Sequence, residues 1–210
     1  MSGSPTRPTI AAAVLVPLLV AFPAGATGLD QLKAFIDGAR TGKATFRQVV
    51  MSKSPRVPQE SNGTFAFARP GKFRWSYDRP FAQLLVGDGD KLWIYDRDLN
   101  QVIVKKLDTA LGATPAALLA GSNTLESNFD LADAGSSAGL EYVDAKPKSP
   151  ETGFERVRIG LKDNLPRAME LFDSFGHVTQ LTFDSFERNP ALDPGTFKFV
   201  PPPGVDVVGN

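Results

Sequence analysis

The sequence contains no cysteine and only one histidine, His177. Without cysteine it cannot form disulfide bonds, thiolate nucleophiles or cysteine-based metal sites. One histidine is too few for a multi-histidine metal site, and any Ser-His-Asp triad would have to use His177. This residue follows a predicted turn, which favours a surface position. We therefore expect a protein with no catalytic activity, no metal and no cofactor.

The sequence also lacks an excess of charge of either sign, since Lys plus Arg and Asp plus Glu each total 23. A net charge of zero provides no long-range field toward nucleic acid or an anionic membrane, so nucleic-acid binding is not expected. Tyrosine and tryptophan are scarce, at 3 and 2 residues, whereas phenylalanine occurs 15 times. This abundance of phenylalanine predicts a large apolar surface, used either for packing or for binding.

The N-terminal segment has the layout of a secretion signal. Arg7 precedes an apolar stretch from Ile10 to Phe22, and Ala24-Gly25-Ala26 then supplies the small-x-small pattern of a cleavage site. With about 13 residues, the apolar stretch is shorter than the ~20 that a membrane-spanning helix needs. We expect residues 1–26 to be removed on export and residues 27–210 to form a single periplasmic domain.

One helix and a series of strands are predicted next. Apolar residues recur at helical spacing between residues 28 and 40, which predicts an amphipathic helix. From Gly63 onward the period changes to two, so that each strand has one strongly aromatic face. Residues 52–61, with two prolines, predict a loop, and Asp88-Gly89 predicts a hairpin turn. Strands are expected at residues 45–51, 63–67, 72–78, 83–86, 91–95 and 101–106.

The second half of the chain contains one short predicted helix and further strands. Thr114 as N-cap, Pro115 at the first position and Gly121 beyond the end predict a helix over this segment. Residues 133–152, rich in Ala, Ser, Gly and Pro, are expected to be loop-like in part. A hairpin turn is expected at residues 173–176. The remaining strands are expected at residues 156–162, 168–172 and 177–186.

This succession of strands with few helices predicts a mainly β fold made of a single curved antiparallel sheet. The helices expected at residues 28–40 and 114–120 are available to cover its open face.

Several motifs, in this order, resemble those of the lipoprotein carrier family LolA. Residues 63–75, Gly-Thr-Phe-Ala-Phe-Ala-Arg-Pro-Gly-Lys-Phe-Arg-Trp, resemble the family segment in which one strand ends in Arg-Pro and the next begins with Phe-x-Trp. Further similarities lie at residues 86–95, at Thr114-Pro115, at Asn189-Pro190-x-x-Asp193-Pro194 and in the tail at residues 197–208. The resemblance therefore covers nearly the whole chain after the signal segment.

The resemblance implies an incomplete antiparallel β-barrel with short helices forming a lid over a hydrophobic cavity. It also implies a monomeric carrier that receives lipoproteins from an inner-membrane ABC transporter, LolCDE, and hands them to an outer-membrane receptor, LolB. Neither step requires chemistry by the carrier. The side chains expected to line the acyl-chain cavity are Phe65, Phe67, Phe73, Trp75, Tyr77, Leu118, Leu119 and Met169.

Arg69 is a candidate latch for the lid. It follows Phe67 by two residues, so the period of a strand places it on the aromatic side, where a charge needs partners. By resemblance, the arginine at this position bonds backbone carbonyls of the lid, and we expect these near Thr114 to Leu119. The alternative is a surface arginine beside a turn, just as the aromatic residues have the alternative of an ordinary core.

Three other functions compete with the carrier. A LolA-like periplasmic lipid sensor or regulatory module usually adds a second domain, which we do not expect after the Pro-rich tail at residues 201–204. An outer-membrane receptor of the LolB type needs an N-terminal lipid-modified cysteine, against which the absence of cysteine argues. A secreted hydrolase needs a catalytic constellation that one histidine does not supply.

Overall fold

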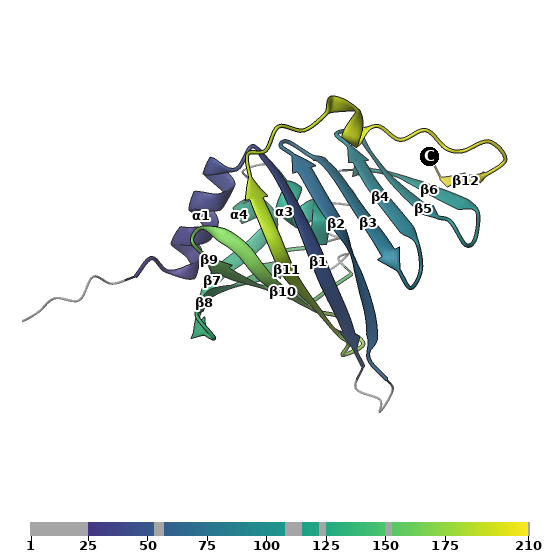
Figure 1. Ribbon diagram of the computed structural model, residues 1–210. Coiled ribbons are helices and arrows are strands. Elements are labelled where there is room, and N and C mark those ends of the chain that lie inside the picture. Colours follow the sequence, from purple (N-terminus) through teal and green to yellow (C-terminus); the bar gives the residue numbers. More distant parts are fainter. Residues whose placement is uncertain (1–24, 53–56, 108–114, 122–124, 150–152, 210) are drawn as a thin grey trace, which may run out of the picture.

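The computed structural model describes residues 25–52, 57–107, 115–121, 125–149 and 153–209 (Figure 1). Most of them belong to one sheet of twelve strands, and the remainder include helices and connecting turns. The elements are α1 (Gly28–Gly38), β1 (Thr41–Met51), β2 (Gln59–Ala68), β3 (Lys72–Arg79), β4 (Gln83–Asp88), β5 (Lys91–Asp96), β6 (Gln101–Lys106), α3 (Pro115–Ala120), α4 (Leu125–Asn128), β7 (Phe129–Ser137), β8 (Leu140–Pro147), β9 (Arg156–Lys162), β10 (Leu165–Phe172), β11 (Val178–Arg188), η1 (Pro194–Phe197) and β12 (Asp206–Gly209).

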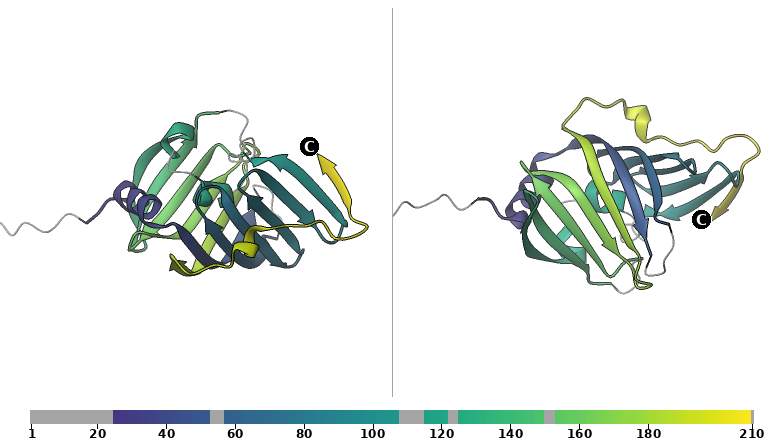
Figure 2. Two further views of the ribbon diagram at one scale, coloured as in Figure 1. Left: turned by 90° about the horizontal axis from the view of Figure 1, so that it is seen from above. Right: turned by 60° about the horizontal axis from the view of Figure 1, so that its bottom comes forward.

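The sheet consists of two meanders that meet in its middle. Its strand order is β12-β6-β5-β4-β3-β2-β1-β11-β10-β9-β8-β7. The chain runs outward from β1 to β6, crosses to the opposite edge through α3 and α4, and returns from β7 to β11, which pairs with β1. The sheet is strongly curved and not closed, with its first and last strands at separate edges (Figures 1 and 2). The prediction of a mainly β, incompletely closed barrel is confirmed.

Helix α1 forms because its start is capped and its apolar residues lie on one stripe. The Thr27 side chain accepts a hydrogen bond from the Asp30 amide, and the Asp30 carboxylate accepts one from the Thr27 amide. Leu32, Phe35 and Ile36 are buried at helical spacing, and the helix packs against β7, β8, β9 and β10. The helix predicted over residues 28–40 is confirmed, ending at Gly38.

The main core lies on the concave side of the sheet. Alternating residues of β2 and β3 face the same way, and Phe65 pairs across the strands with Trp75, as Phe67 does with Phe73. These rings form one buried cluster with side chains from α1, α3 and the returning meander. Helix α3 contacts β2 and β3, so it covers the aromatic part of this face (Figure 2).

A second, smaller apolar cluster lies on the convex side. Leu84, Val86, Val102 and Val104 are buried there, on the register positions that alternate with the concave residues. The segment after β11 crosses this side of β3 and β4 at η1 (Figure 1). Phe197, the last residue of η1, is buried. The two faces therefore have separate apolar packing.

Several predicted boundaries were wrong. Residues 133–149 are loop-like only at 138–139 and 148–149, since the rest form the second half of β7 and all of β8, which were not predicted as strands. The turn between β7 and β8 has positive φ at Ala138 and Gly139. β2 begins at Gln59, inside the predicted loop, and β1 begins at Thr41, before the predicted Thr45. β12 was not predicted, and it pairs parallel to β6, so one pair of this sheet is not antiparallel. The expected N-cap Thr114 lies outside the described residues.

Candidate functional site: an apolar concave face closed by an arginine

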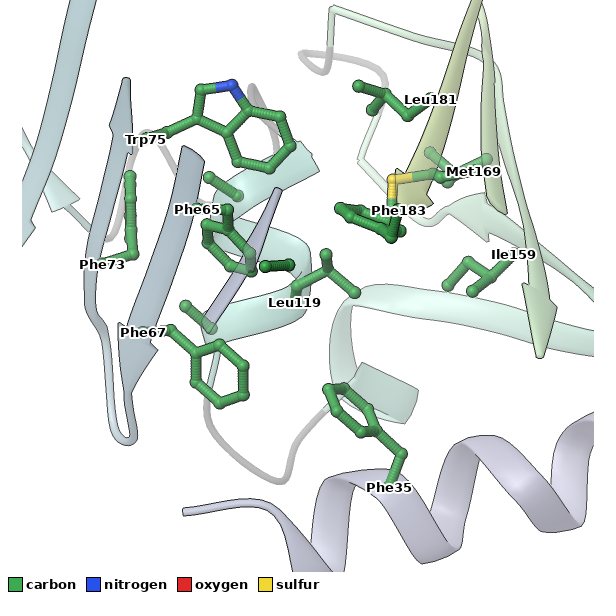
Figure 3. Close-up of a cluster of buried hydrophobic side chains, with 14 of the residues drawn as sticks. Phe35, Phe65, Phe67, Phe73, Trp75, Leu119, Ile159, Met169, Leu181 and Phe183 are labelled. Carbon is green, nitrogen blue, oxygen red and sulfur yellow. The ribbon is translucent and has the colours of Figure 1, made fainter. Parts of the chain in front are cut away.

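Four of the predicted cavity residues form the aromatic centre of the concave face. Phe65, Phe67, Phe73 and Trp75 are all at most 1% exposed. The Phe65 ring centroid lies 4.9 Å from that of Trp75 and 5.6 Å from that of Phe67. Figure 3 shows these rings with Leu119 of α3 beside them and Met169 of β10 across the cluster.

The aromatic rings fit because glycine occupies the backbone positions beneath two of them. A Cβ atom on Gly42 would lie 2.2 Å from the Phe67 ring, and one on Gly87 would lie 2.5 Å from the Phe73 ring. Both rings thus lie directly against neighbouring strands.

Tyr77 and Leu118 differ from the other predicted cavity residues. Tyr77 is partly buried at the border of the cluster, and its hydroxyl donates a hydrogen bond of 3.0 Å to Oε1 of Gln48. Leu118 belongs to α3, but its side chain lies outside the described part of the structure.

Arg69 connects the ends of two helices. Its Nε donates to the carbonyl oxygen of Ala39 at 2.9 Å, and its Nη1 donates to that of Gly121 at 2.6 Å. Ala39 caps the end of α1 and Gly121 follows α3, so both acceptors are carbonyls that a helix leaves without an internal partner. The positive guanidinium also interacts favourably with the C-terminal ends of the helix dipoles.

The surroundings of Arg69 are otherwise apolar. Its guanidinium carbon lies 5.2 Å from the Phe35 ring centroid and 5.1 Å from that of Phe67, within the range of a cation–π interaction. Burial lowers the pKa of Arg69 to about 10, so the side chain is still charged at neutral pH. Its Nη2 is buried and has no acceptor among the described residues. The charge is therefore held by two strong bonds and two rings.

The turn that follows Arg69 also binds α3. The amide of Gly71 donates to the carbonyl of Ala120 at 3.2 Å, beside the bond from Arg69 to Gly121. Arg69 does point toward the aromatic side, as its spacing from Phe67 predicts. On the lid side its acceptor is the carbonyl of Gly121, two residues beyond the segment near which it was expected, and the second acceptor, the carbonyl of Ala39, was not predicted.

Sequence reasoning missed several members of the site. Phe46, Phe183 and Phe186 belong to the same buried aromatic cluster, and Phe35 lies beside Arg69. The helical spacing over residues 28–40 includes Phe35 in the apolar stripe, but only the path of the chain brings it to the strand end that carries Arg69. Phe183 and Phe186 are three positions apart, so a strand period of two predicts that they lie on opposite sides of the sheet, whereas both belong to the buried cluster.

The described residues offer little for other chemistry. His177 is half-exposed, with its Nδ1 2.7 Å from the Asp173 carboxylate in the turn between β10 and β11. Residues 135–139 have Gly-x-Ser-x-Gly spacing, but they form the end of β7 and its turn to β8, whereas a hydrolase nucleophile needs a turn from strand to helix. No cluster of three or more potential metal ligands occurs in the described ranges. None of the helices described there is long and apolar enough to cross a bilayer.

The family that matches this chain and two of its relatives share one description. The family described as outer membrane lipoprotein carrier protein LolA matches residues 37–200. An outer-membrane lipoprotein carrier protein of Dechloromonas aromatica (strain RCB) is 55% identical over 196 residues, covering 93% of this chain and 92% of that protein. Another, from Nitrosospira multiformis, is 50% identical, covering 88% and 90%.

A solved structure has the same fold at low sequence identity. It is an uncharacterized conserved protein from Thermus thermophilus, with a TM-score of 0.55 and 16% identity, covering 86% of this chain and 96% of that one. At this identity the similarity concerns the fold alone. The match of the family over most of the chain, together with the two relatives, shows that the chain belongs to the outer membrane lipoprotein carrier protein family, LolA.

Proposed function

We propose that this protein carries lipoproteins through the periplasm with their acyl chains held on the concave apolar face. One observation carries the proposal: helices cover an aromatic face of an open sheet, and Arg69 bonds the carbonyl ends of α1 and α3. The curated relatives bear the name outer-membrane lipoprotein carrier protein.

The binding energy comes from the burial of acyl chains. Each methylene removed from water contributes about 0.8 kcal/mol, so on the order of ten methylenes supply roughly 8 kcal/mol. This is sufficient for carriage and is still reversible. Since the aromatic side chains are already packed against Leu119 and Phe35, an acyl chain enters only when a covering helix moves away.

Arg69 is the latch of the closed state in this proposal. Its two carbonyl bonds stabilise the covered arrangement, and cargo binding must break at least one of them. The free energy needed to break these bonds is small compared with the free energy that acyl-chain burial supplies. The proposed cavity residues remain Phe65, Phe67, Phe73, Trp75, Tyr77, Leu118, Leu119 and Met169.

The carrier takes its cargo from the inner-membrane transporter LolCDE and delivers it to the outer-membrane receptor LolB. Transfer moves an intact lipoprotein between proteins and breaks no covalent bond, so the proposed role is not that of an enzyme. A monomer with residues 27–210 as its single domain fits this role, with residues 1–26 acting as the export signal. N-terminal sequencing of the periplasmic protein should find Thr27 or a neighbouring residue first, whereas retention of residues 10–22 would contradict export by cleavage.

Release of lipoprotein from membranes tests the proposal. Inner-membrane vesicles that contain the transporter and a labelled lipoprotein are incubated with the purified protein and ATP. We expect the lipoprotein to appear in the soluble fraction bound to this protein, and not when serum albumin replaces it. Lipoprotein that stays in the vesicles with both proteins would refute the carrier role.

A further inference from the structure

A polar pocket lies at the end of the concave face opposite Arg69. Arg69 is in the turn before β3, and the pocket surrounds the turn after β3 and the neighbouring end of β1. Its volume is about 330 Å³. The polar side chains that line it are Gln48, Gln59, Ser61, Tyr77, Gln83 and Asp96.

Tyr77 and Gln48 separate this pocket from the aromatic cluster. The Tyr77 ring packs edge-on against Phe46 at 5.4 Å and lies 6.2 Å from the Trp75 ring, while its hydroxyl donates to Gln48 Oε1 at 3.0 Å. Burial raises the pKa of Tyr77, which keeps the hydroxyl neutral and able to donate. The pair therefore forms a polar boundary at the end of an apolar face.

Behind this boundary lies a buried donor without an acceptor. Trp75 is 1% exposed, and its Nε1 makes no hydrogen bond of ordinary geometry among the described residues, although it lies near enough to the Tyr77 hydroxyl to oppose in part the rise in the pKa of Tyr77. Figure 3 shows this nitrogen on the side of the indole turned away from Phe35 and α1. Buried N–H groups normally have a partner, because leaving one unpaired costs stability. The other tryptophan follows this rule, since Trp93 Nε1 donates to Asp88 at 2.8 Å.

The chemistry of the pocket suits a neutral acceptor. Amides and hydroxyls line it, none of its lining residues in the described part of the chain is a cation, and Asp96 disfavours a phosphate or carboxylate. In a lipoprotein, ester and amide groups join the acyl chains to the polypeptide. Their carbonyl oxygens are neutral acceptors directly attached to apolar chains, so they belong where an apolar face meets neutral donors.

We propose that this pocket binds the ester and amide junction of the cargo, with the indole N–H of Trp75 and the hydroxyl of Tyr77 donating to its carbonyl oxygens. The inference rests on the proposed function and adds a polar subsite to the acyl-chain site. In the structure Tyr77 donates to Gln48, and Trp75 Nε1 has no hydrogen bond of ordinary geometry among the described residues. Carbonyl oxygens of the cargo would supply an acceptor for Trp75 and replace Gln48 as the acceptor for Tyr77.

Two synthetic triacylated lipopeptides test this subsite with the mature protein. They have equal chain lengths, but one has ester-linked and amide-linked chains and the other ether-linked and amine-linked chains, which lack carbonyl acceptors. NMR of the two ¹⁵N-labelled indole groups follows Trp75 directly, with Trp93 on the convex face as the internal reference. We expect the carbonyl lipopeptide to bind about 3- to 10-fold more tightly and to move the Trp75 N–H signal to a hydrogen-bonded shift.

Tyr77→Phe is the matching variant, with Tyr95→Phe on the convex face as its control. Tyr77→Phe should reduce the preference for the carbonyl lipopeptide severalfold, and Tyr95→Phe should retain it. Equal binding of both lipopeptides with no difference at Trp75 would overturn the subsite and leave the carrier role intact. Failure of both lipopeptides to bind would overturn the carrier role and the subsite together.

Discussion

At the scale of single residues, Arg69 joins parts of the chain that lie far apart in the sequence. It connects the end of α1 through Ala39 and the end of α3 through Gly121, and its charge lies over Phe35 and Phe67. A guanidinium can make both bonds at once because its donors point in fixed, diverging directions. One side chain therefore holds two covering helices.

Arg69→Leu should leave loading intact and impair release. The substitution removes about 1.5–3 kcal/mol of charge-assisted bonding from the closed state and adds apolar surface for the acyl chain. Both effects favour the loaded form, so cargo should accumulate on the variant. Bound lipoprotein and its transfer to LolB are measured in parallel.

Arg69→Lys is the graded control for this prediction. An ammonium group keeps the charge but cannot reproduce the two diverging bonds, so transfer should lie between that of the wild type and that of Arg69→Leu. Normal transfer by Arg69→Leu would show that Arg69 is not a latch.

Phe73→Glu should damage both stability and loading. Phe73 is 0% exposed, so an ionised carboxylate there has no water and loses the packing of the ring. We expect a loss of at least about 3 kcal/mol in the free energy of unfolding, measured by urea titration at pH 7. Burial would raise the pKa of this carboxyl, so the loss should shrink as the pH falls and the group becomes neutral.

Phe175→Glu is the control for Phe73→Glu, because Phe175 is 81% exposed. It should unfold like the wild type and bind lipoprotein normally. A stable and fully active Phe73→Glu protein would contradict the placement of Phe73 in the site.

The sequence predicts those residues of the site that alternate along a single strand. The alternation of Phe65, Phe67 and Arg69 predicts their common side, and the structure has this arrangement. The carbonyl of Ala39 was not predictable, because a backbone acceptor leaves no trace in composition. The unpaired Trp75 N–H likewise emerges only from packing in three dimensions.

At the scale of elements, the C-terminal segment protects the convex face. Phe197 of η1 is buried there, and Phe199 packs against Trp93 and Tyr95. Because this packing is on the opposite side of the sheet from the aromatic cluster, it should affect stability separately from cargo binding.

Phe197→Ala tests this separation. Removing the ring should reduce the free energy of unfolding by about 3 kcal/mol, while the folded variant should still load lipoprotein. The comparison is Phe175→Ala, at an exposed position, which should change neither quantity. Lost loading without lost stability in Phe197→Ala would mean that the convex segment takes part in binding.

Asp144 links two strands of the returning meander. Its carboxylate on β8 accepts bonds from Arg158 at 2.7 and 3.0 Å and from Arg156 at 3.1 Å on β9. The bond from Arg158, with a contribution from Arg156, lowers the pKa of Asp144 below its usual range, against the opposing effect of burial. The folded state therefore binds this proton less readily than the unfolded state does.

Asp144→Asn should be less stable than the wild type only while the carboxylate is ionised. With a lowered folded pKa, its contribution is complete above the unfolded pKa of about 4 and is lost as the pH falls through the folded pKa. We expect a difference of about 1 kcal/mol at pH 7 that shrinks as the pH falls below about 4. Urea titrations of both proteins between pH 7 and pH 2 measure it, and a difference that stays unchanged over this range would exclude the ion pairs as its cause.

Sequence patterns predicted the central strands better than the edge strands. β3 has alternating aromatic residues because its two sides have different surroundings, whereas β7 is mostly exposed and has no such alternation. The Ala-Gly-Ser-Ser-Ala-Gly composition at residues 134–139 therefore indicated a loop. β12 is exposed throughout and follows three prolines, so its pairing with β6 left no pattern to detect.

At the scale of the whole molecule, the sheet supplies the apolar face and the helices cover it. The two meanders form one concave face lined by a continuous cluster of buried hydrophobic side chains, and the covering helices are not part of the sheet. A closed barrel would hold its interior permanently, whereas an open sheet with movable helices can admit and release a chain. The incomplete closure is thus the feature that suits a carrier.

The most direct test is intact mass spectrometry of the protein isolated from the periplasm, in the wild type and in Arg69→Leu. The account predicts complexes with acylated lipoproteins, more abundant in Arg69→Leu because release is impaired. Complexes with free lipids alone would instead indicate a lipid sensor. Free lipids alone, or no bound acylated protein in either sample, would contradict the claim that the concave face carries lipoproteins.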